Sequence, residues 1–204
     1  MSSGSDYYRS FAARWPNIRG TVPLSRMIVS VRSSGRLLEV GCGRGMLLEL
    51  LAKQFDAYGT DISELGVAES AARVGPERVF RHSIEDGPPP GRYEVVLAIN
   101  VLEHIHKPEI ALRNINAVLE PGGTFIFTVP NNSPGFGRFA TWVMDVTDRS
   151  HVSALPWTRW RELCAEVGFE FVEARFPSWF GILTSPTARR FATNALFIYR
   201  KPAA

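Results

Sequence analysis

A glycine-rich turn between a short apolar run and an amphipathic segment is the feature that most constrains how this chain folds. Residues 36–40 form an apolar run that ends at glycine, as a buried parallel strand does. The turn reads Glu39-Val40-Gly41-Cys42-Gly43-Arg44-Gly45, and apolar residues follow it at helical spacing from Met46. Glycines let a ligand lie against the backbone, and its carboxylate, hydroxyl or phosphate groups can meet free amides at the helix start. This unit predicts a ligand site at the first strand–helix connection.

Apolar runs alternate with helical patterns through short connections along most of the chain, which favours a doubly wound α/β fold with a parallel sheet and right-handed crossovers. We expect strands at 36–40, 57–61, 78–81, 93–99 and 124–129, with 169–175 and 195–199 as a closing pair. We expect helices at 24–31 with Pro23 in the first turn, from 46 onward, and at 63–73, 108–119 and 157–167.

Length and composition fit a single globular domain. The 204 residues suit one sizeable core, and 45% hydrophobic with 21% charged residues is near the globular norm. No run of about 18 apolar residues is present, and residues 1–6 lack the apolar stretch of a signal peptide, so we expect a cytoplasmic protein without a membrane span. The net charge of +3 and the scattered arginines argue against a nucleic-acid partner. Cys42 and Cys164 lack a CxxC partner, which argues against a disulfide framework or a zinc cluster.

An acidic residue, Asp61, ends the second expected strand about twenty residues beyond the glycines. At that position a carboxylate can accept hydrogen bonds from both hydroxyls of a ribose. The alternative for Asp61 is a helix N-cap, because Asp61-Ile62-Ser63 leads into a helix, although Ser63 can also cap that helix. The dinucleotide fingerprint G-x-G-x-x-G fits less well, since Met46 stands where its third glycine would be.

Four blocks in this order resemble the successive motifs of class I S-adenosylmethionine-dependent methyltransferases, especially the small-molecule group related to ubiquinone O-methyltransferases. The blocks are Leu37-Leu38-Glu39-Val40-Gly41-Cys42-Gly43-Arg44-Gly45, Gly59-Thr60-Asp61-Ile62-Ser63, Tyr93-Glu94-Val95-Val96-Leu97 with Asn100-Val101-Leu102-Glu103-His104-Ile105, and Leu119-Glu120-Pro121-Gly122-Gly123. The resemblance covers about residues 35–130. It implies a Rossmann-like, doubly wound, mostly parallel seven-stranded sheet with helices on both faces and an antiparallel last strand. It also implies one methyltransferase domain over 1–204, with an N-terminal helical lid at 1–34, a cofactor-binding core at 35–130, and substrate-side insertions with the last helix at 131–190.

The resemblance further implies S-adenosylmethionine as cofactor, S-adenosylhomocysteine as product, and a set of cofactor-binding residues. The set is Glu39, Gly41, Cys42, Gly43, Gly45, Asp61, Ile62, Ser83, Ile84 and Asn100. Within this set, the resemblance implies that Glu39 and the glycine loop hold the methionine end of the cofactor. It also implies that Asp61 binds the ribose and that Ile62 packs on one face of the adenine. Ser83 and Ile84 follow the third strand, where the adenine edge is usually read; relatives usually have an aspartate in place of Ser83.

Asn100 departs from the pattern of the ubiquinone-type relatives, which carry an acidic residue at this position. There the acid, with residues matching Glu103 and His104, can form a metal site. Because an asparagine is a poorer ligand for hard cations than a carboxylate, we expect no metal here. The alternative for Glu103 and His104 is a hydrogen-bonded pair that braces the sheet edge.

Two histidines are candidate catalytic residues, His151 and His104. His151 resembles a pocket-facing residue of relatives and could take a proton from a hydroxyl nucleophile; the alternative is a structural role. Aromatic residues outside the recognised core could line the acceptor pocket, for which we single out Tyr7, Tyr8, Phe136 and Trp142. Ordinary core packing is the alternative for each of them.

The function expected from the resemblance is methyl transfer to a small-molecule acceptor, most readily O-methylation of a quinone or phenol, a sugar or a natural-product metabolite. Three alternatives stay open: a cofactor-binding protein without turnover, a methyltransferase acting on RNA or protein, and a nicotinamide-dependent oxidoreductase. The oligomeric state is open too, and a homodimer is among the states that the sequence allows.

Overall fold

The computed structural model describes residues 18–131, 152–153, 155–178, 181–183 and 194–203. Its helices are α2 (Ile18–Val31), α3 (Met46–Leu51), α4 (Glu64–Val74), α5 (Pro108–Val118) and α7 (Trp157–Glu166), with short 3-10 turns η2 (Pro76–Arg78) and η3 (Leu102–His104). Its strands are β1 (Arg36–Val40), β2 (Asp56–Asp61), β3 (Val79–Arg81), β4 (Tyr93–Ile99), β5 (Leu119–Pro130), β6 (Glu170–Ser178), β7 (Gly181–Leu183) and β8 (Asn194–Arg200).

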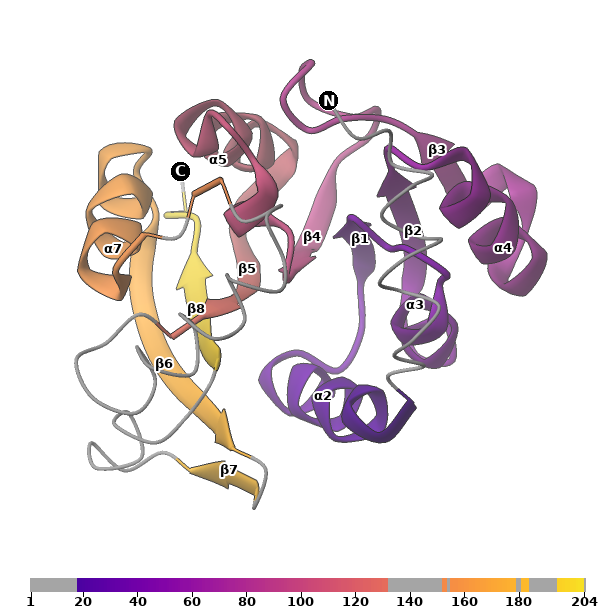
Figure 1. The fold of residues 1–204 in the computed structure, drawn as a ribbon, viewed down its shortest axis with the longest axis horizontal. Helices are drawn as coiled ribbons and strands as arrows, with labels where there is room; N and C mark the ends of the chain where they lie inside the picture. Colours follow the sequence, from indigo (N-terminus) through magenta and orange to yellow (C-terminus); the bar gives the residue numbers. More distant parts are fainter. Residues whose placement is uncertain (1–17, 132–151, 154, 179–180, 184–193, 204) are drawn as a thin grey trace.

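The strands form one mixed sheet in the order β3-β2-β1-β4-β5-β8-β6-β7 (Figure 1). Strands β1 to β5 pair in parallel, whereas β8 is antiparallel to both neighbours, β5 and β6. The first seven strands in this order confirm the predicted mostly parallel sheet with an antiparallel last strand. The eighth, β7, is not predicted by the sequence, because a three-residue strand paired to the end of β6 is too short to leave a periodic pattern.

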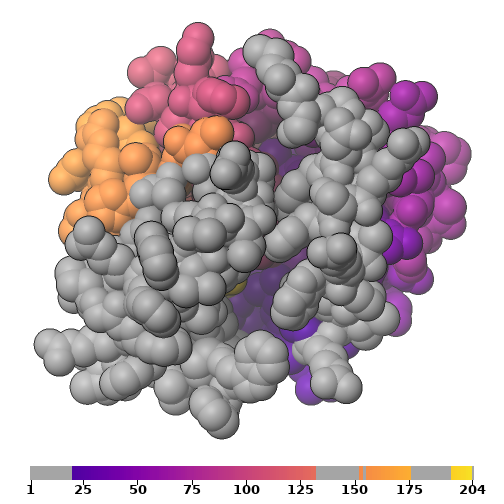
Figure 2. Space-filling model, viewed as in Figure 1, coloured from indigo at the N-terminus to yellow at the C-terminus, as the bar shows by residue number. Residues whose placement is uncertain are grey.

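Helices cover both faces of the sheet. Helices α2, α3 and α4 pack on one face and α5 and α7 on the other, and Figure 2 shows α4 and α7 at opposite sides of the molecule. Successive residues of a strand enter opposite layers: Leu37 packs on the α3 side and Leu38 on the α5 side, both fully buried. Because both layers are apolar, the central strands are apolar at nearly every position, which is the signal that predicts them.

The direction in which the chain builds the sheet reverses between β1 and β4. From β1 the chain adds β2 and β3 on one side, then crosses to add β4 on the other side of β1. In sheets of this kind the crevice at the carboxyl ends of the strands flanking the reversal is where ligands bind. Those ends are Val40 on β1 and Ile99 on β4, with Asp61 at the end of neighbouring β2.

Two element boundaries differ from the prediction. Helix α2 begins at Ile18, so Pro23 lies inside the helix instead of in its first turn, and the helix continues despite the missing backbone donor. Strand β5 begins at Leu119 and includes the Pro121-Gly122-Gly123 segment, across which its pairing with β4 shifts register. Within the part of the chain that the structure describes, no helix is long and apolar enough to cross a membrane.

Candidate functional site

The glycine loop between β1 and α3 passes through three left-handed glycines, with φ of 68° at Gly41, 54° at Gly43 and 75° at Gly45. This region of φ strongly favours glycine. At Gly41 a side chain would also be excluded by space, because an added Cβ would collide with the Cγ2 atom of Val101, just after β4. The loop backbone is thus held tightly against the segment that follows β4, at the crevice.

Glu39, the penultimate residue of β1, is buried beside this loop and is 4% exposed. Within the described residues its Oε2 atom is buried with no hydrogen-bond partner. Burial, and then the negative charge of Asp61, raise the pKa of the Glu39 carboxyl from 4.5 to about 8. A buried, incompletely satisfied acid of this kind is suited to receive a cationic hydrogen-bond donor from a ligand.

Asp61 at the end of β2 is 5% exposed and joins two segments through its carboxylate. Its Oδ2 accepts a 2.8 Å hydrogen bond from the backbone N–H of Gly43, and its Oδ1 accepts one of the same length from the N–H of Ser63. The N-cap of α4 is Ser63, whose hydroxyl accepts from the N–H of Gly66 at 3.3 Å. The alternative reading of Asp61 as the N-cap is therefore wrong. A carboxylate has about four acceptor positions, and these two bonds use two of them.

The residue after Asp61 presents an apolar side chain to the surface. Ile62 is 60% exposed, and Leu65, one residue into the first turn of α4, is 47% exposed. Two exposed aliphatic side chains beside a buried carboxylate form a surface on which a flat ring can pack.

Two further members of the predicted set turn their side chains away from the crevice. Cys42 is buried against Gly59 and α3, and burial raises the pKa of its thiol well above the usual range, so the group is neutral. Ile84 is 4% exposed and packs in the α5-side core. Both residues can therefore serve a ligand only through their backbone. Ser83 is half-buried, and its hydroxyl accepts from the N–H of Glu85 at 3.3 Å.

Asn100 follows β4 directly and is exposed. Its φ of 53° is the single positive value among the non-glycine residues that the structure describes. The hydroxyl of Thr128 on β5 accepts from the backbone N–H of Asn100 at 3.0 Å and donates to its Oδ1 at 2.9 Å. The side chain that the resemblance places at the methyl-donor end is thus fixed by a neighbouring strand.

His104 is half-buried at the end of η3, next to Glu103, which is 2% exposed. Ser153 fastens this segment, since its N–H donates to the carbonyl of Glu103 at 2.9 Å and its hydroxyl to that of Ile105 at 2.6 Å. Among the described residues, no group of three or more His, Cys, Asp or Glu is arranged to hold a metal ion. The other predicted catalytic and acceptor-binding residues, His151, Tyr7, Tyr8, Phe136 and Trp142, lie outside the described residues.

The structure thus brings Glu39, the glycine loop and Asp61 together, with Asn100 on the adjoining strand end. Sequence reasoning missed Thr128 and Val101 as parts of this site. Val101 stands in the block that begins at Asn100 but has no role assigned to it there. Thr128 carries no motif signal, because it reaches Asn100 only through the pairing of Ile99 with Thr128 between β4 and β5.

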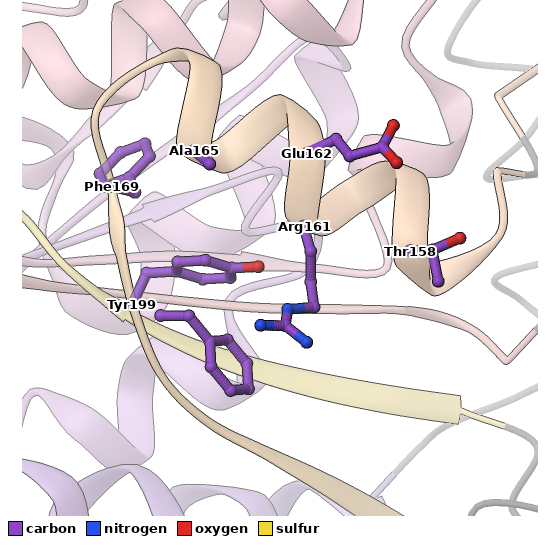
Figure 3. A pocket seen from close by; sticks show the side chains of 7 residues that line it. Thr158, Arg161, Glu162, Ala165, Phe169 and Tyr199 are labelled. Atoms are coloured by element: carbon purple, nitrogen blue, oxygen red, sulfur yellow. The ribbon is translucent and has the colours of Figure 1, made fainter.

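An open hollow of about 360 Å³ lies elsewhere, between α7 and strands β6 and β8 (Figure 3). There the guanidinium of Arg161 lies 4.3 Å from the ring centre of Phe171. None of the predicted site residues that the structure describes lines this hollow.

Comparison with known sequences supports one family. A family model described as a methyltransferase domain matches residues 23–174, most of the chain. The ubiquinone biosynthesis O-methyltransferase of Methylococcus capsulatus is 33% identical over 144 residues, which cover 62% of this chain and 60% of that protein. The chain therefore spans about 60% of the length of this relative.

Solved structures share the fold at low identity. A methyltransferase from Thermotoga maritima, described as a possible histamine N-methyltransferase, has a TM-score of 0.76 at 15% identity, covering 96% of this chain and 97% of that one. The N-methyltransferase NodS from Bradyrhizobium japonicum, in complex with S-adenosyl-L-homocysteine, has a TM-score of 0.66 at 17% identity, covering 90% and 86%. The family model spans helices on both faces of the sheet and the strand ends at the crevice. The chain therefore belongs to the methyltransferase domain family, whose members use S-adenosylmethionine.

Proposed function

We propose that this chain transfers a methyl group from S-adenosylmethionine to an oxygen of a small-molecule acceptor: a quinone or phenol, a sugar or a natural-product metabolite. The observation that carries the proposal is the bond between Asp61 and the N–H of Gly43, beside the buried carboxyl of Glu39. It places an acceptor for sugar hydroxyls and an acceptor for an ammonium group beside one glycine loop.

The residues present fit this cofactor. The buried Oε2 of Glu39 suits the ammonium of the methionine end, and Asp61 suits the ribose. Ile62, 60% exposed, would cover one face of the adenine. When bound, the cofactor supplies a methyl group already activated on a sulfonium.

The charge of the crevice distinguishes this cofactor from a dinucleotide. Glu39 and Asp61 are two acids at a turn where a diphosphate would need positive charge or free amides. The N–H of Gly43, one such amide, is already donated to Asp61. Asp61 disfavours a diphosphate at this turn, and the Glu39 carboxyl, which keeps its proton up to about pH 8, can ionise when it meets an ammonium group. Both features weigh against the nicotinamide-dependent alternative.

The chain's own contribution to the reaction is binding and orientation. The glycine loop and Asp61 hold the donor in the crevice, and the segment starting at Asn100 borders the position where an acceptor must approach in line. A hydroxyl acceptor also needs to lose a proton, and we propose His151 or His104 as the base. A phenolate needs orientation alone.

Several parts of the proposal rest on the sequence. The division into a lid at 1–34, a cofactor core at 35–130 and substrate-side insertions at 131–190 stays a prediction, as do the cytoplasmic location and a homodimer. Oxygen as the acceptor atom is supported by the name of the Methylococcus relative, of which the chain spans about 60%.

The test is calorimetric titration of the purified chain with S-adenosylhomocysteine, followed by transfer of radiolabelled methyl from S-adenosylmethionine to phenols, sugars and carboxylates. We expect saturable 1:1 binding and labelled product with at least one oxygen acceptor. Absence of binding at millimolar ligand contradicts the proposal. Binding without transfer to any acceptor, RNA or protein included, favours the non-catalytic alternative.

A further inference from the structure

Asn100 holds an unusual backbone conformation at the mouth of the crevice. Its φ of 53° lies in the left-handed region, which non-glycine residues adopt rarely and asparagine more readily than most. Such outliers persist where the surrounding structure enforces them, and they cluster at functional sites. Asparagine at this position therefore combines tolerance of the backbone turn with a side chain that glycine would not supply.

Thr128 determines which end of the Asn100 amide is available. Its hydroxyl accepts from the backbone N–H of Asn100 at 3.0 Å and donates its own proton to Oδ1 at 2.9 Å. The Thr128 side chain belongs to a residue only 4% exposed on β5, so the hydroxyl is fixed. With Oδ1 engaged, the two Nδ2 protons of Asn100 are the part of the amide left outside this pair of bonds.

The position of Asn100 relative to the glycine loop decides what these protons can meet. The next residue, Val101, lies against Gly41, so Asn100 borders the loop that receives the methionine end of the cofactor. This exposed donor beside the loop lies at the carboxyl end of β4, the edge at which sheets of this kind bind ligands.

We propose that Asn100 is a specificity-determining residue that donates from Nδ2 to the nucleophilic oxygen of the acceptor and so selects oxygen over nitrogen acceptors; this rests on the proposed function of the same site. An oxygen nucleophile has lone pairs both for this bond and for attack. A neutral amine has one lone pair, which the donor would occupy, and its own N–H groups would need an acceptor.

The transfer step balances with this arrangement. One lone pair of the acceptor oxygen forms the new C–O bond, while the pair of the breaking C–S bond stays on sulfur. A phenolate loses no proton in the step, and the proton of a neutral hydroxyl passes to a base or to water. The N–H donor stabilises the phenolate relative to the phenol, so it lowers the pKa of the bound acceptor.

4-Nitrophenol bound to the complex of protein and S-adenosylhomocysteine is the probe, because its absorbance reports ionisation without turnover. We expect its apparent pKa to be lower in the wild-type complex than in water. The variants are Asn100→Asp and Asn100→Gly. Aspartate and glycine both tolerate a positive φ, so neither substitution adds backbone strain at this position. Each should weaken nitrophenolate binding by about tenfold or more, the effect of losing a hydrogen bond to a charged group.

Thr128→Val tests the orienting hydroxyl, with Thr128→Ser as its matched control. Thr128→Val should lose nitrophenolate affinity as the Asn100 variants do, whereas Thr128→Ser should keep the affinity of the wild type. S-adenosylhomocysteine affinity is measured in parallel for every variant, and nitrophenolate binding is compared at concentrations that saturate each protein with S-adenosylhomocysteine. In methyl-transfer assays the wild type should prefer 4-nitrophenol to 4-nitroaniline, and Asn100→Asp should reduce that preference.

Three results overturn the inference: unchanged nitrophenolate affinity in Asn100→Asp and Asn100→Gly, an equal preference for the aniline, or a wild-type complex that binds 4-nitrophenol no better than the protein alone. Each leaves the proposed cofactor function standing if S-adenosylhomocysteine binds. Failure of that ligand to bind the wild type overturns the proposed function itself.

Discussion

The Oδ2 atom of Asp61 accepts a 2.8 Å hydrogen bond from the backbone N–H of Gly43, across a separation of 18 residues. This bond ties the end of β2 to the glycine loop that follows β1. It places a carboxylate beside the loop. The same side chain therefore supports the shape of the loop and offers acceptors to a ribose.

Replacement of Asp61 by alanine should weaken S-adenosylhomocysteine binding by about 100-fold or more, because two charge-assisted hydrogen bonds to sugar hydroxyls are lost. It should also lower the free energy of unfolding by about 1–3 kcal/mol, since the N–H groups of Gly43 and Ser63 lose their acceptor. Calorimetry and urea unfolding measure the two effects. Glu64→Ala, which removes a nearby exposed acid on α4, is the control and should change neither. An Asp61→Ala protein with wild-type affinity would refute the ribose assignment.

Replacement of Ser63 by alanine separates capping from ligand binding. The hydroxyl of Ser63 caps α4, so its loss should lower the free energy of unfolding by about 1 kcal/mol. Affinity for S-adenosylhomocysteine should change by less than about twofold, because the backbone N–H that Asp61 uses is retained. Urea unfolding measures the stability of the variant, and calorimetry measures its affinity for S-adenosylhomocysteine. A large loss of affinity without loss of stability would mean that Ser63 itself contacts the ligand.

Replacement of Gly41 by alanine should abolish detectable S-adenosylhomocysteine binding and destabilise the fold by about 2 kcal/mol or more, because the new Cβ is strained at φ 68° and collides with Val101. Gly122→Ala is the matched control: its φ is 73°, but no atom lies within 4 Å of the added Cβ. It should cost about 1 kcal/mol from strain and leave binding intact. Thermal unfolding compares the stability of the two variants, and calorimetry compares their affinity for S-adenosylhomocysteine. Equal losses in both variants would exclude a contribution from the collision with Val101.

The raised pKa of Glu39 makes both stability and binding depend on pH. In the folded protein this carboxyl binds its proton up to about pH 8, whereas in the unfolded chain it releases it near 4.5. The native state therefore holds more protons between these values, and the Glu39 contribution to stability falls as pH rises through that window. Urea unfolding of wild type and Glu39→Gln at several pH values should show their difference in stability shifting in favour of the glutamine variant as pH rises.

Ligand binding should follow the opposite trend. An ammonium group favours the ionised carboxyl of Glu39, so binding below about pH 8 requires release of a proton. Affinity for S-adenosylhomocysteine should rise by up to about tenfold per pH unit between roughly pH 6 and 7.5. Calorimetry in two buffers of different ionisation enthalpy counts the released proton. Glu39→Gln should bind more weakly with a flat profile, and a wild type that releases no proton would argue against contact with the ammonium.

The sequence by itself determined the fold class and the places of the glycine loop and Asp61 at the ends of neighbouring strands. The apolar run at 36–40, the glycines after it and Asp61 one strand later are local signals, because strand burial, backbone turns and short connections depend on neighbouring residues. From these the order of elements and the crevice follow.

Only the tertiary structure decided how the residues of the site depend on one another. The bonds between Asn100 and Thr128 exist because β4 and β5 pair with Ile99 opposite Thr128, and the need for glycine at 41 comes from Val101, which is remote in sequence. These relationships are set by strand register and by packing across the sheet, which a linear pattern of residue types does not encode.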